Sequence, residues 1–456
     1  MRLIILFFIL FQTLALNAQV GIGTTSPNPA SILDVESSTK GFLIPRLTAS
    51  ERDNITDPAE GLMLYCTNCC LSGSSITFYN GERWENVPDC TTREDVVAGA
   101  SQVTANANDF VVVLGSDGNL YSWGDESPSN NKALGIGIDN STGKPKEPTP
   151  FANPGNISFI QSVSAHHGSA IALSVDGYVY GAGLSNKGAG NTGDPNEFTK
   201  IQLGGSDTKA ILLGSSEGGS IAIGEDDKAY LWGYNSDSYF GAWAGVSPQE
   251  VSLPSGVLTS NIVSVGGSFH YLSIASETKV YVTGSTAWGT TSPGAWTAHA
   301  ETFNTISKVR VGRNMIMVED NDGLHLLNNI TTKQTVDISA ITDPIIKKTT
   351  DGSDNNLYIV TASTIYYKNF PSDMSGATEV DAPVGFEIED VLVNNINSDW
   401  VMVKLKQTSD SSIHYYGFKV GTSAEAHLGD FNASQNVMQD LNLNTAAIPN
   451  GVELNW

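Results

Sequence analysis

The hydrophobic pattern from Arg93 onward repeats one unit, which is an apolar run, a polar turn and a second strand ending in a small residue. In the first copy, Phe110–Leu114 leads through Ser116-Asp117-Gly118 to Leu120–Gly124. An equivalent position in the second strand, aromatic in every copy, recurs every 41 to 59 residues, which is the spacing of a repeat architecture. These positions are Tyr121, Tyr180, Tyr230, Tyr281, His325, Tyr366 and Tyr415.

Seven copies divide residues 93–456 into units of about 52 residues, enough for four short strands and their turns. A single unit would leave both faces of its sheet exposed, and a closed radial arrangement buries them. The pattern therefore predicts an all-β chain with a seven-bladed β-propeller over residues 93–456. The copies from Met315 onward are fainter. The tail Gly451–Trp456 alternates like a strand, and we expect it to close the ring by joining the blade that starts after Arg93.

The segment 19–92 has a different pattern and predicts a small β-rich module. Strand-like runs occupy Ile32–Val35, Gly41–Leu47 and Leu62–Tyr65, and Asn80-Gly81 predicts a hairpin turn before Trp84. Thr48 and Glu51 form a capping box, which predicts a short helix over residues 49–54. The opening Gly21–Pro27 could suggest a phosphate loop, but no strand precedes it and proline blocks a following helix.

The first residues predict export. Arg2 is followed by the apolar run Leu3–Phe11, which is too short to span a bilayer, and cleavage is expected after Ala18. The alternative is a short uncleaved anchor. No later stretch is long and apolar enough for membrane insertion. The formal charge of −24 argues against binding nucleic acid or anionic lipid.

All four cysteines lie in one short segment of the module. An exported chain favours disulfides among them, and the alternative zinc knuckle lacks a histidine in this segment. The sequence leaves the three pairings open. The cysteines are Cys66, Cys69, Cys70 and Cys90.

A search for catalytic or metal-binding motifs favours a non-enzyme without cofactor or metal. His166, His167 and His270 stand at comparable repeat positions, and no nucleophile elbow, zinc motif or carboxylate pair accompanies them. We therefore interpret them as packing residues instead of catalytic groups. Acidic residues in the hairpin turns could suggest calcium, but they lack the spaced oxygen ligands of a calcium loop, and turn formation explains them better. They are Asp117, Asp176 and Asp322.

Two loops rich in aromatic residues follow the second strands of the third and fourth copies. Neighbouring blades place equivalent loops side by side, so these residues could form one binding patch. Alternatively, Phe240 and Trp288 fill the packing position that Leu134 holds in the first copy, which leaves Trp243 and Trp296 as the better candidates for exposed contacts. The candidate binding residues are Trp243, Trp296, Tyr239 and Trp288, with Tyr234 beside them.

Two resemblances extend this interpretation. The phrases "SDGNLYSWG", "VDGYVYGAG" and "KAYLWG" resemble the regulator of chromosome condensation repeat family, whose fold is a seven-bladed propeller. Its chromatin and small-GTPase roles do not transfer to an exported acidic chain. A secreted β-lactamase inhibitor built on the same propeller implies protein binding as one use. The phrases "VGIGT", "KGFLIPRLT" and "FYNGERW" resemble an N-terminal module of secreted Gram-negative bacterial and tail-fibre-like proteins, which implies surface display and a homotrimer.

The sequence therefore predicts a secreted or cell-surface adhesion protein of a Gram-negative bacterium, with the periplasm as a second location. Its propeller would recognise an extracellular protein or glycan. The alternative is a secreted hydrolase or lyase that acts on polysaccharide at the mouth of the propeller. Fold alone does not separate the two.

Overall fold

The computed structural model divides the chain into two compact units, one up to Asp89 except 70–72, and the other comprising 70–72 and Cys90–Trp456. The structure describes residues 20–48, 51–52, 54–70, 73–81, 84–87, 110–124, 149–150, 157, 159–165, 169–183, 197–215, 220–233, 245–267, 271–284, 288, 295–312, 314–350, 355–393, 400–420, 436–441, 443, 448–449, 452 and 454–455.

The N-terminal unit contains two small sheets. β1 (Val20–Ile22) pairs in parallel with β2 (Leu33–Val35). The second sheet has the order β3 (Arg46–Leu47), β4 (Met63–Cys70), β5 (Gly73–Tyr79) and β6 (Trp84–Val87). The predicted hairpin is confirmed, because β5 and β6 pair antiparallel around Asn80-Gly81 and Gly81 has a φ of 97°.

Two local predictions in this unit have different outcomes. The capping box is confirmed, since the Thr48 backbone N–H donates to Glu51 and the Glu51 N–H donates to the Thr48 hydroxyl. Residues 51–52 are helical, and the rest of the expected helix is not fully described. The strand expected over Gly41–Leu47 was wrong in length, because only Arg46–Leu47 pairs. Pro45 has no N–H to donate to a ladder, which limits pairing before it.

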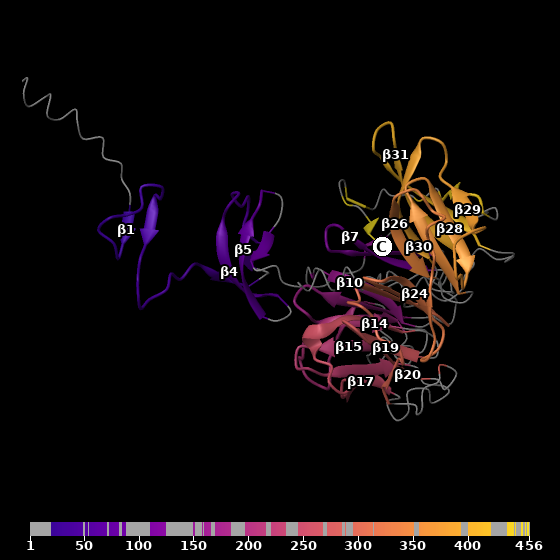
Figure 1. Cartoon of the computed structure of the whole chain (residues 1–456), viewed down its shortest axis with the longest axis horizontal. Helices are drawn as coiled ribbons and strands as arrows, with labels where there is room; N and C mark the ends of the chain where they lie inside the picture. Colours follow the sequence, from indigo (N-terminus) through magenta and orange to yellow (C-terminus); the bar gives the residue numbers. More distant parts are fainter. Residues whose placement is uncertain are drawn as a thin grey trace, which may run out of the picture. The chain divides into compact units, whose positions relative to one another are not determined.

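The described residues of the second unit form seven four-stranded sheets in chain order, as expected for seven blades (Figure 1). Blade 1 contains β34 (Leu454–Asn455), β7 (Phe110–Gly115), β8 (Leu120–Gly124) and β9 (Thr149–Pro150). Blade 2 contains β10 (Phe159–Ala165), β11 (Ser169–Ser174), β12 (Val179–Gly183) and β13 (Thr199–Ile201). Blade 3 contains β14 (Ala210–Ser215), β15 (Ser220–Gly224), β16 (Ala229–Gly233) and β17 (Gly245–Val251).

The remaining four blades have the same antiparallel order, so the faint copies after Met315 are complete. Blade 4, which follows the short 3-10 helix η4 (Thr259–Asn261), contains β18 (Ile262–Gly267), β19 (Tyr271–Ser276), β20 (Val280–Gly284) and β21 (Thr297–Ala298). Blade 5 contains β22 (Lys308–Val311), β23 (Ile316–Asp320), β24 (Gly323–Leu327) and β25 (Lys333–Thr335). Blade 6 contains β26 (Ile345–Thr350), β27 (Asn356–Thr361), β28 (Thr364–Asn369) and β29 (Thr378–Asp381). Blade 7 contains β30 (Phe386–Val393), β31 (Trp400–Gln407), β32 (Ile413–Lys419) and β33 (Gln439–Asp440).

The core of the propeller lies between the blades. Successive buried clusters join blades 1 and 2, 2 and 3, 3 and 4, 4 and 5, 5 and 6, and 6 and 7. A further cluster joins blade 7 to blade 1 through Trp400, Tyr121 and Leu454. Each sheet therefore buries both faces against its neighbours, which is the stabilisation that the repeat pattern predicted.

The expected closing strand is confirmed. β34 pairs antiparallel with β7, with Leu454 opposite Gly115 and Asn455 opposite Leu114. The C-terminal residues thus share a blade with the first repeat.

Within the described parts of the chain, no helix is long and apolar enough to cross a membrane.

Candidate functional site

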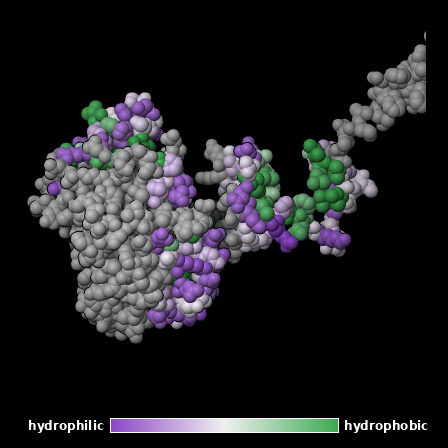
Figure 2. Space-filling model, turned by 180° about the vertical axis from the view of Figure 1, so that it is seen from behind, coloured by the Kyte–Doolittle hydropathy of each residue, from purple (hydrophilic) through white to green (hydrophobic). Residues whose placement is uncertain are grey.

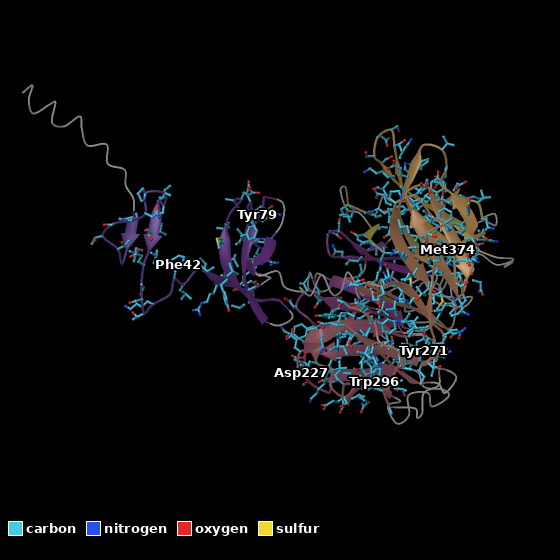
Figure 3. All side chains as sticks on the ribbon, in the orientation of Figure 1. Phe42, Tyr79, Asp227, Tyr271, Trp296 and Met374 are labelled. Carbon is cyan, nitrogen blue, oxygen red and sulfur yellow. The ribbon has the colours of Figure 1, made fainter. Side chains whose placement is uncertain are left out.

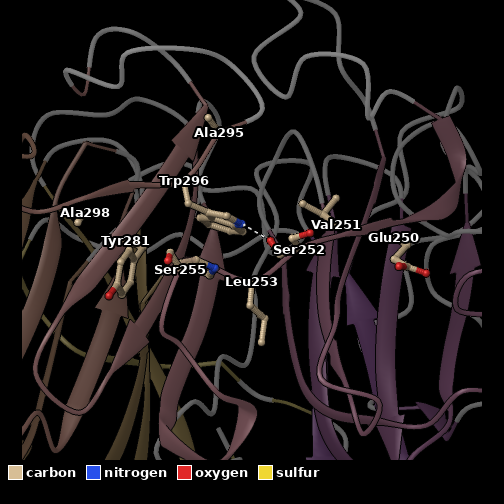
Figure 4. Close-up of a pocket in the computed structure, with 10 residues that line it drawn as sticks. Glu250, Val251, Ser252, Leu253, Ser255, Tyr281, Ala295, Trp296 and Ala298 are labelled. Atoms are coloured by element: carbon tan, nitrogen blue, oxygen red, sulfur yellow. Dashed lines mark hydrogen bonds between the residues drawn. The ribbon is translucent and has the colours of Figure 1, made fainter.

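A pocket of about 750 Å³ opens between the outer strands of blades 3 and 4. One wall is the segment that continues β17, from Glu250 to Ser255, and the other is formed by Tyr281 on β20 and by Trp296 and Ala298 at β21 (Figure 4). Val251 on β17, Tyr281 on β20 and Ala298 on β21 are fixed by the ladders of their own blades, whereas Ser252 to Ser255 and Trp296 lie just outside these strands. The lining combines polar groups, such as Glu250, Ser252 and Ser255, with the apolar surfaces of Leu253, Tyr281 and Trp296.

Trp296 is the central side chain of this pocket. It is partly exposed and packs, with Leu253 and Tyr281, against the buried cluster between blades 3 and 4. Trp296 is labelled on the ribbon in Figure 3. Its indole N–H donates to the Ser252 carbonyl at 3.1 Å, which connects the two walls (Figure 4). The bond fixes the ring orientation, so Trp296 offers a rigid aromatic surface at little cost in side-chain entropy.

An acidic residue stands at one end of the pocket. The Lys228 ammonium donates to the Glu250 carboxylate at 2.8 Å, and this bond raises the pKa of Lys228. Lys228 also lies 3.8 Å from Asp226. Lys228 and Glu250 are both well exposed, so their ion pair is weak. A cation of a ligand can therefore replace Lys228 at the Glu250 carboxylate.

Trp288 must be removed from the list of surface contacts. Its side chain is only 4% exposed and belongs to the core between blades 4 and 5. The ring lies 4.3 Å from that of Tyr271, whose hydroxyl donates to the Gly312 carbonyl at 2.6 Å. The sequence analysis gave packing between blades as the alternative to a surface contact for Trp288. The burial of its side chain shows that the packing interpretation is correct.

The other members of the aromatic patch lie outside the described residues. These are Tyr234, Tyr239, Phe240 and Trp243, and the reference position Leu134 is also outside. The same holds for His166, His167 and His270. Of the expected patch, the structure therefore places Trp296 alone in an open pocket.

Among the cysteines, Cys66 is buried beside Leu64 and is disulfide-bonded. The side chains of Cys69, Cys70 and Cys90 lie outside the described residues. The structure describes no cluster of His, Cys, Asp or Glu that could hold a metal within the ranges given above.

Asp117 in the first hairpin turn and Asp226 in the equivalent turn of blade 3 accept hydrogen bonds from tyrosines of their own blades. The Tyr121 hydroxyl donates to Asp117 at 2.8 Å, and the Tyr230 hydroxyl donates to Asp226 at 2.6 Å. Burial, together with Asp117, raises the pKa of Tyr121. The same repeat position in blade 5 is His325, which lies 2.8 Å from Asp320. The repeat alignment identified these aromatic positions, but it did not predict that each contacts an acidic residue of its own blade.

The Asp320–His325 pair resembles the orienting pair of a hydrolase, but its surroundings differ. Burial opposes ionisation of Asp320, yet hydrogen bonds from the Asn304 backbone N–H and from His325 lower its pKa. The other imidazole nitrogen contacts the Thr335 hydroxyl at 3.0 Å. Both side chains of the pair are almost fully buried, so we assign them to packing in blade 5.

Residues 21–105 match the family model described as a phage tail like trimerisation region. A stretch of 175 residues is 29% identical to the X-linked retinitis pigmentosa GTPase regulator of Canis lupus familiaris, covering 37% of this chain. The match spans only 16% of that relative's length.

The fold is similar to solved propellers. Prp20p from Saccharomyces cerevisiae gives a TM-score of 0.54 at 13% identity, covering 78% of this chain and 90% of Prp20p. A second structure of Prp20, identified as yeast RCC1 and bound to Kap60, gives 0.53 at 14% identity, covering 76% of this chain and 88% of that one. Human WBSCR16 gives 0.50 at 13% identity, covering 68% and 87%. The chain therefore carries an N-terminal segment similar to the phage tail like trimerisation region, followed by a β-propeller whose fold is similar to that of yeast RCC1.

Proposed function

We propose that this protein is a secreted or cell-surface recognition protein that binds a partner protein at the pocket between blades 3 and 4. The observation that carries the proposal is the position of Trp296 in that pocket. A rigid aromatic wall beside the exposed Glu250 carboxylate suits a protruding side chain of a partner, in which a cation accompanies apolar atoms. Of the related structures, Prp20p was described together with its binding to Gsp1p and histones, and also bound to Kap60.

The charge of the chain defines the class of partner. A formal charge of −24 repels anionic proteins and attracts cationic ones over long range. The Glu250 carboxylate places the same sign inside the pocket. We therefore propose a cationic extracellular protein as the partner.

The N-terminal unit supports display as a trimer. Hydrophobic surface gathers on this unit (Figure 2). The exposed large apolar side chains include Ile32, Phe42 and Leu43, which are 82%, 67% and 72% exposed. Every residue of β1 is exposed as well. Such apolar surface marks an interaction site, and association with two further copies would cover it. Three copies would present three pockets and raise avidity.

Export rests on the N-terminal apolar run and on the disulfide at Cys66. The apolar run lies outside the described residues. A buried disulfide suits an oxidising compartment.

A photo-crosslinking experiment tests the pocket. A benzophenone amino acid at position 255, on the rim of the pocket, is compared with the same group at Ser339, which is exposed in blade 5. The mature chain is incubated with extracellular proteins of the cells that produce it. We expect one basic protein to be crosslinked from position 255 and not from 339, and Trp296→Ala to reduce the yield about tenfold, as for a hot-spot residue.

Two results would contradict this function. Identical products from both positions would show that the pocket does not select a partner. Capture on a glycan array that is lost in Trp296→Ala, without any protein crosslink, would assign the pocket to sugars. Thermal unfolding of the variant must remain close to that of the wild type, because Trp296 also packs against the core.

A further inference from the structure

A group of cationic side chains lies on the first strands of blades 5 and 6, far in sequence from the pocket. First strands of consecutive blades are neighbours in this fold, so β22, β26 and β30 lie side by side. Four cations, Lys308, Arg310, Lys347 and Lys348, share this region with the two carboxylates Glu319 and Asp390. The group carries an excess of two positive charges in a protein whose total charge is strongly negative.

The two lysines of β26 are already paired. Lys348 lies 2.5 Å from Glu319 of blade 5, and Lys347 lies 2.5 Å from Asp390 of blade 7. Lys347 also donates to the Val391 carbonyl at 2.9 Å. Both carboxylates are therefore engaged by lysines, and the cations of β22 are left in excess.

Arg310 is the unusual member of the group. Its side chain is only 9% exposed, and its Nε is buried without a hydrogen-bond partner. Within the part of the chain that the structure describes, no ion pair is formed by Arg310 or by Lys308. Burial of an N–H donor without a partner is costly, and buried donors in native proteins normally have one. Burial lowers the pKa of Arg310 to about 10, and it also lowers the pKa of Lys308, with Arg310 adding to that effect.

Strand alternation directs these side chains to one seam. Val309 and Val311 pack in the cluster shared with blade 4, so Lys308 and Arg310 lie on the opposite face of β22, toward blade 6. On β26, Thr350 lies on the same face as Lys348, which reaches blade 5. The Thr350 hydroxyl is also buried without a partner. Two unpartnered polar atoms thus face the same seam between blades 5 and 6.

We propose that the seam between blades 5 and 6 binds a compact oxyanion of the sulfate or phosphate class through Arg310, Lys308 and the Thr350 hydroxyl. Residues two apart on a strand are separated by about 7 Å, a distance that one tetrahedral anion can bridge. Guanidinium groups bind such oxyanions through paired N–H donors, and the hydroxyl supplies a further donor. The anion is either free or the sulfate or phosphate group of a larger ligand.

Thermal unfolding of the mature full chain at constant pH and ionic strength tests this site. Chloride is replaced by sulfate or inorganic phosphate, and a sulfated disaccharide is compared with its unsulfated form to detect the larger ligand. We expect the melting temperature to rise with anion concentration and to saturate. The general stabilisation by sulfate does not saturate in this way, and it is present in every variant.

Arg310→Met keeps the stem of the side chain and removes the charge, so it should abolish the saturable rise. Lys308→Met should raise about tenfold the anion concentration that gives half of the rise in melting temperature. Because Lys308 is more exposed than Arg310, this variant also provides the test if Arg310→Met does not fold. Lys368→Met is the matched control, because Lys368 pairs with Asp373 in the outer part of blade 6. It should leave the midpoint unchanged. No saturable rise in the wild type, or the same rise in Arg310→Met and Lys308→Met, would overturn the proposal.

Discussion

The closing strand β34 pairs through Leu454 and Asn455, and Leu454 belongs to the buried core of the propeller. Its side chain is completely buried in the cluster that joins blade 7 to blade 1. Leu454→Ala removes three carbon groups from this cluster. At about 0.8 kcal/mol for each, the transfer loss is about 2.4 kcal/mol, and the cavity that remains raises the total to about 3–4 kcal/mol.

Urea unfolding of the mature chain, followed by tryptophan fluorescence, measures this loss. The matched control is Leu258→Ala, because Leu258 is 59% exposed at the start of η4 and its truncation should change the free energy of unfolding by less than about 0.5 kcal/mol. Hydrogen exchange at the Leu114 amide, which lies opposite Asn455 of β34, reports the strand pairing separately. The Gly115 amide is the internal reference, because its N–H donates to the Asn119 carbonyl within the β7–β8 hairpin.

The refuting result is specific. If Leu454→Ala lowers the free energy of unfolding by less than about 1 kcal/mol, while the amides of β7 exchange faster, then β34 frays independently of the ring. The propeller would then be stable as an open arc, and the C-terminal strand would not be its closure.

Three further predictions concern other parts of the chain. Gly224→Ala should destabilise the propeller by about 2–3 kcal/mol in urea unfolding, because a Cβ there would lie 2.3 Å from Asp226 and 2.9 Å from the Tyr230 ring; Tyr230→Phe, which removes only the hydrogen bond, should cost about 1 kcal/mol. The free energy of unfolding should rise between pH of about 8 and 10.5, because burial lowers the pKa of Lys347 to about 8 from an ordinary 10.5. Over this pH range the unfolded chain binds more protons than the folded chain, so stability increases with pH. The urea midpoint is measured against pH, and a Lys347→Met variant with the same slope would disprove the assignment. Phe42→Ser should shift the mature chain from trimer toward monomer in sedimentation velocity, since a buried Phe contributes about 1.5–3 kcal/mol per protomer, and an unchanged trimer would place the interface elsewhere.

The repeat architecture could be predicted from the sequence because it is encoded locally. Each blade has its own apolar runs and its own turn, so period and length were enough to predict seven four-stranded units and the closing tail. The Asn80-Gly81 hairpin and the Thr48–Glu51 capping box are equally local, since turn and cap geometry depends on a few adjacent residues.

Contacts between blades were decided by the tertiary structure. The sequence could not show whether Trp288 is exposed or buried, because a side chain in the loop after β20 can point either way. The packing of its ring against Tyr271 is a tertiary contact, and this contact buries it. Trp296 gained its partner from Ser252, 44 residues away. Lys347 and Lys348 are adjacent in sequence, yet alternation along the strand sends them to different blades, where their partners are 43 and 29 residues distant. Strand periodicity fixes which face a side chain occupies, whereas the charge and shape that it meets there depend on which sheet the closed ring places opposite.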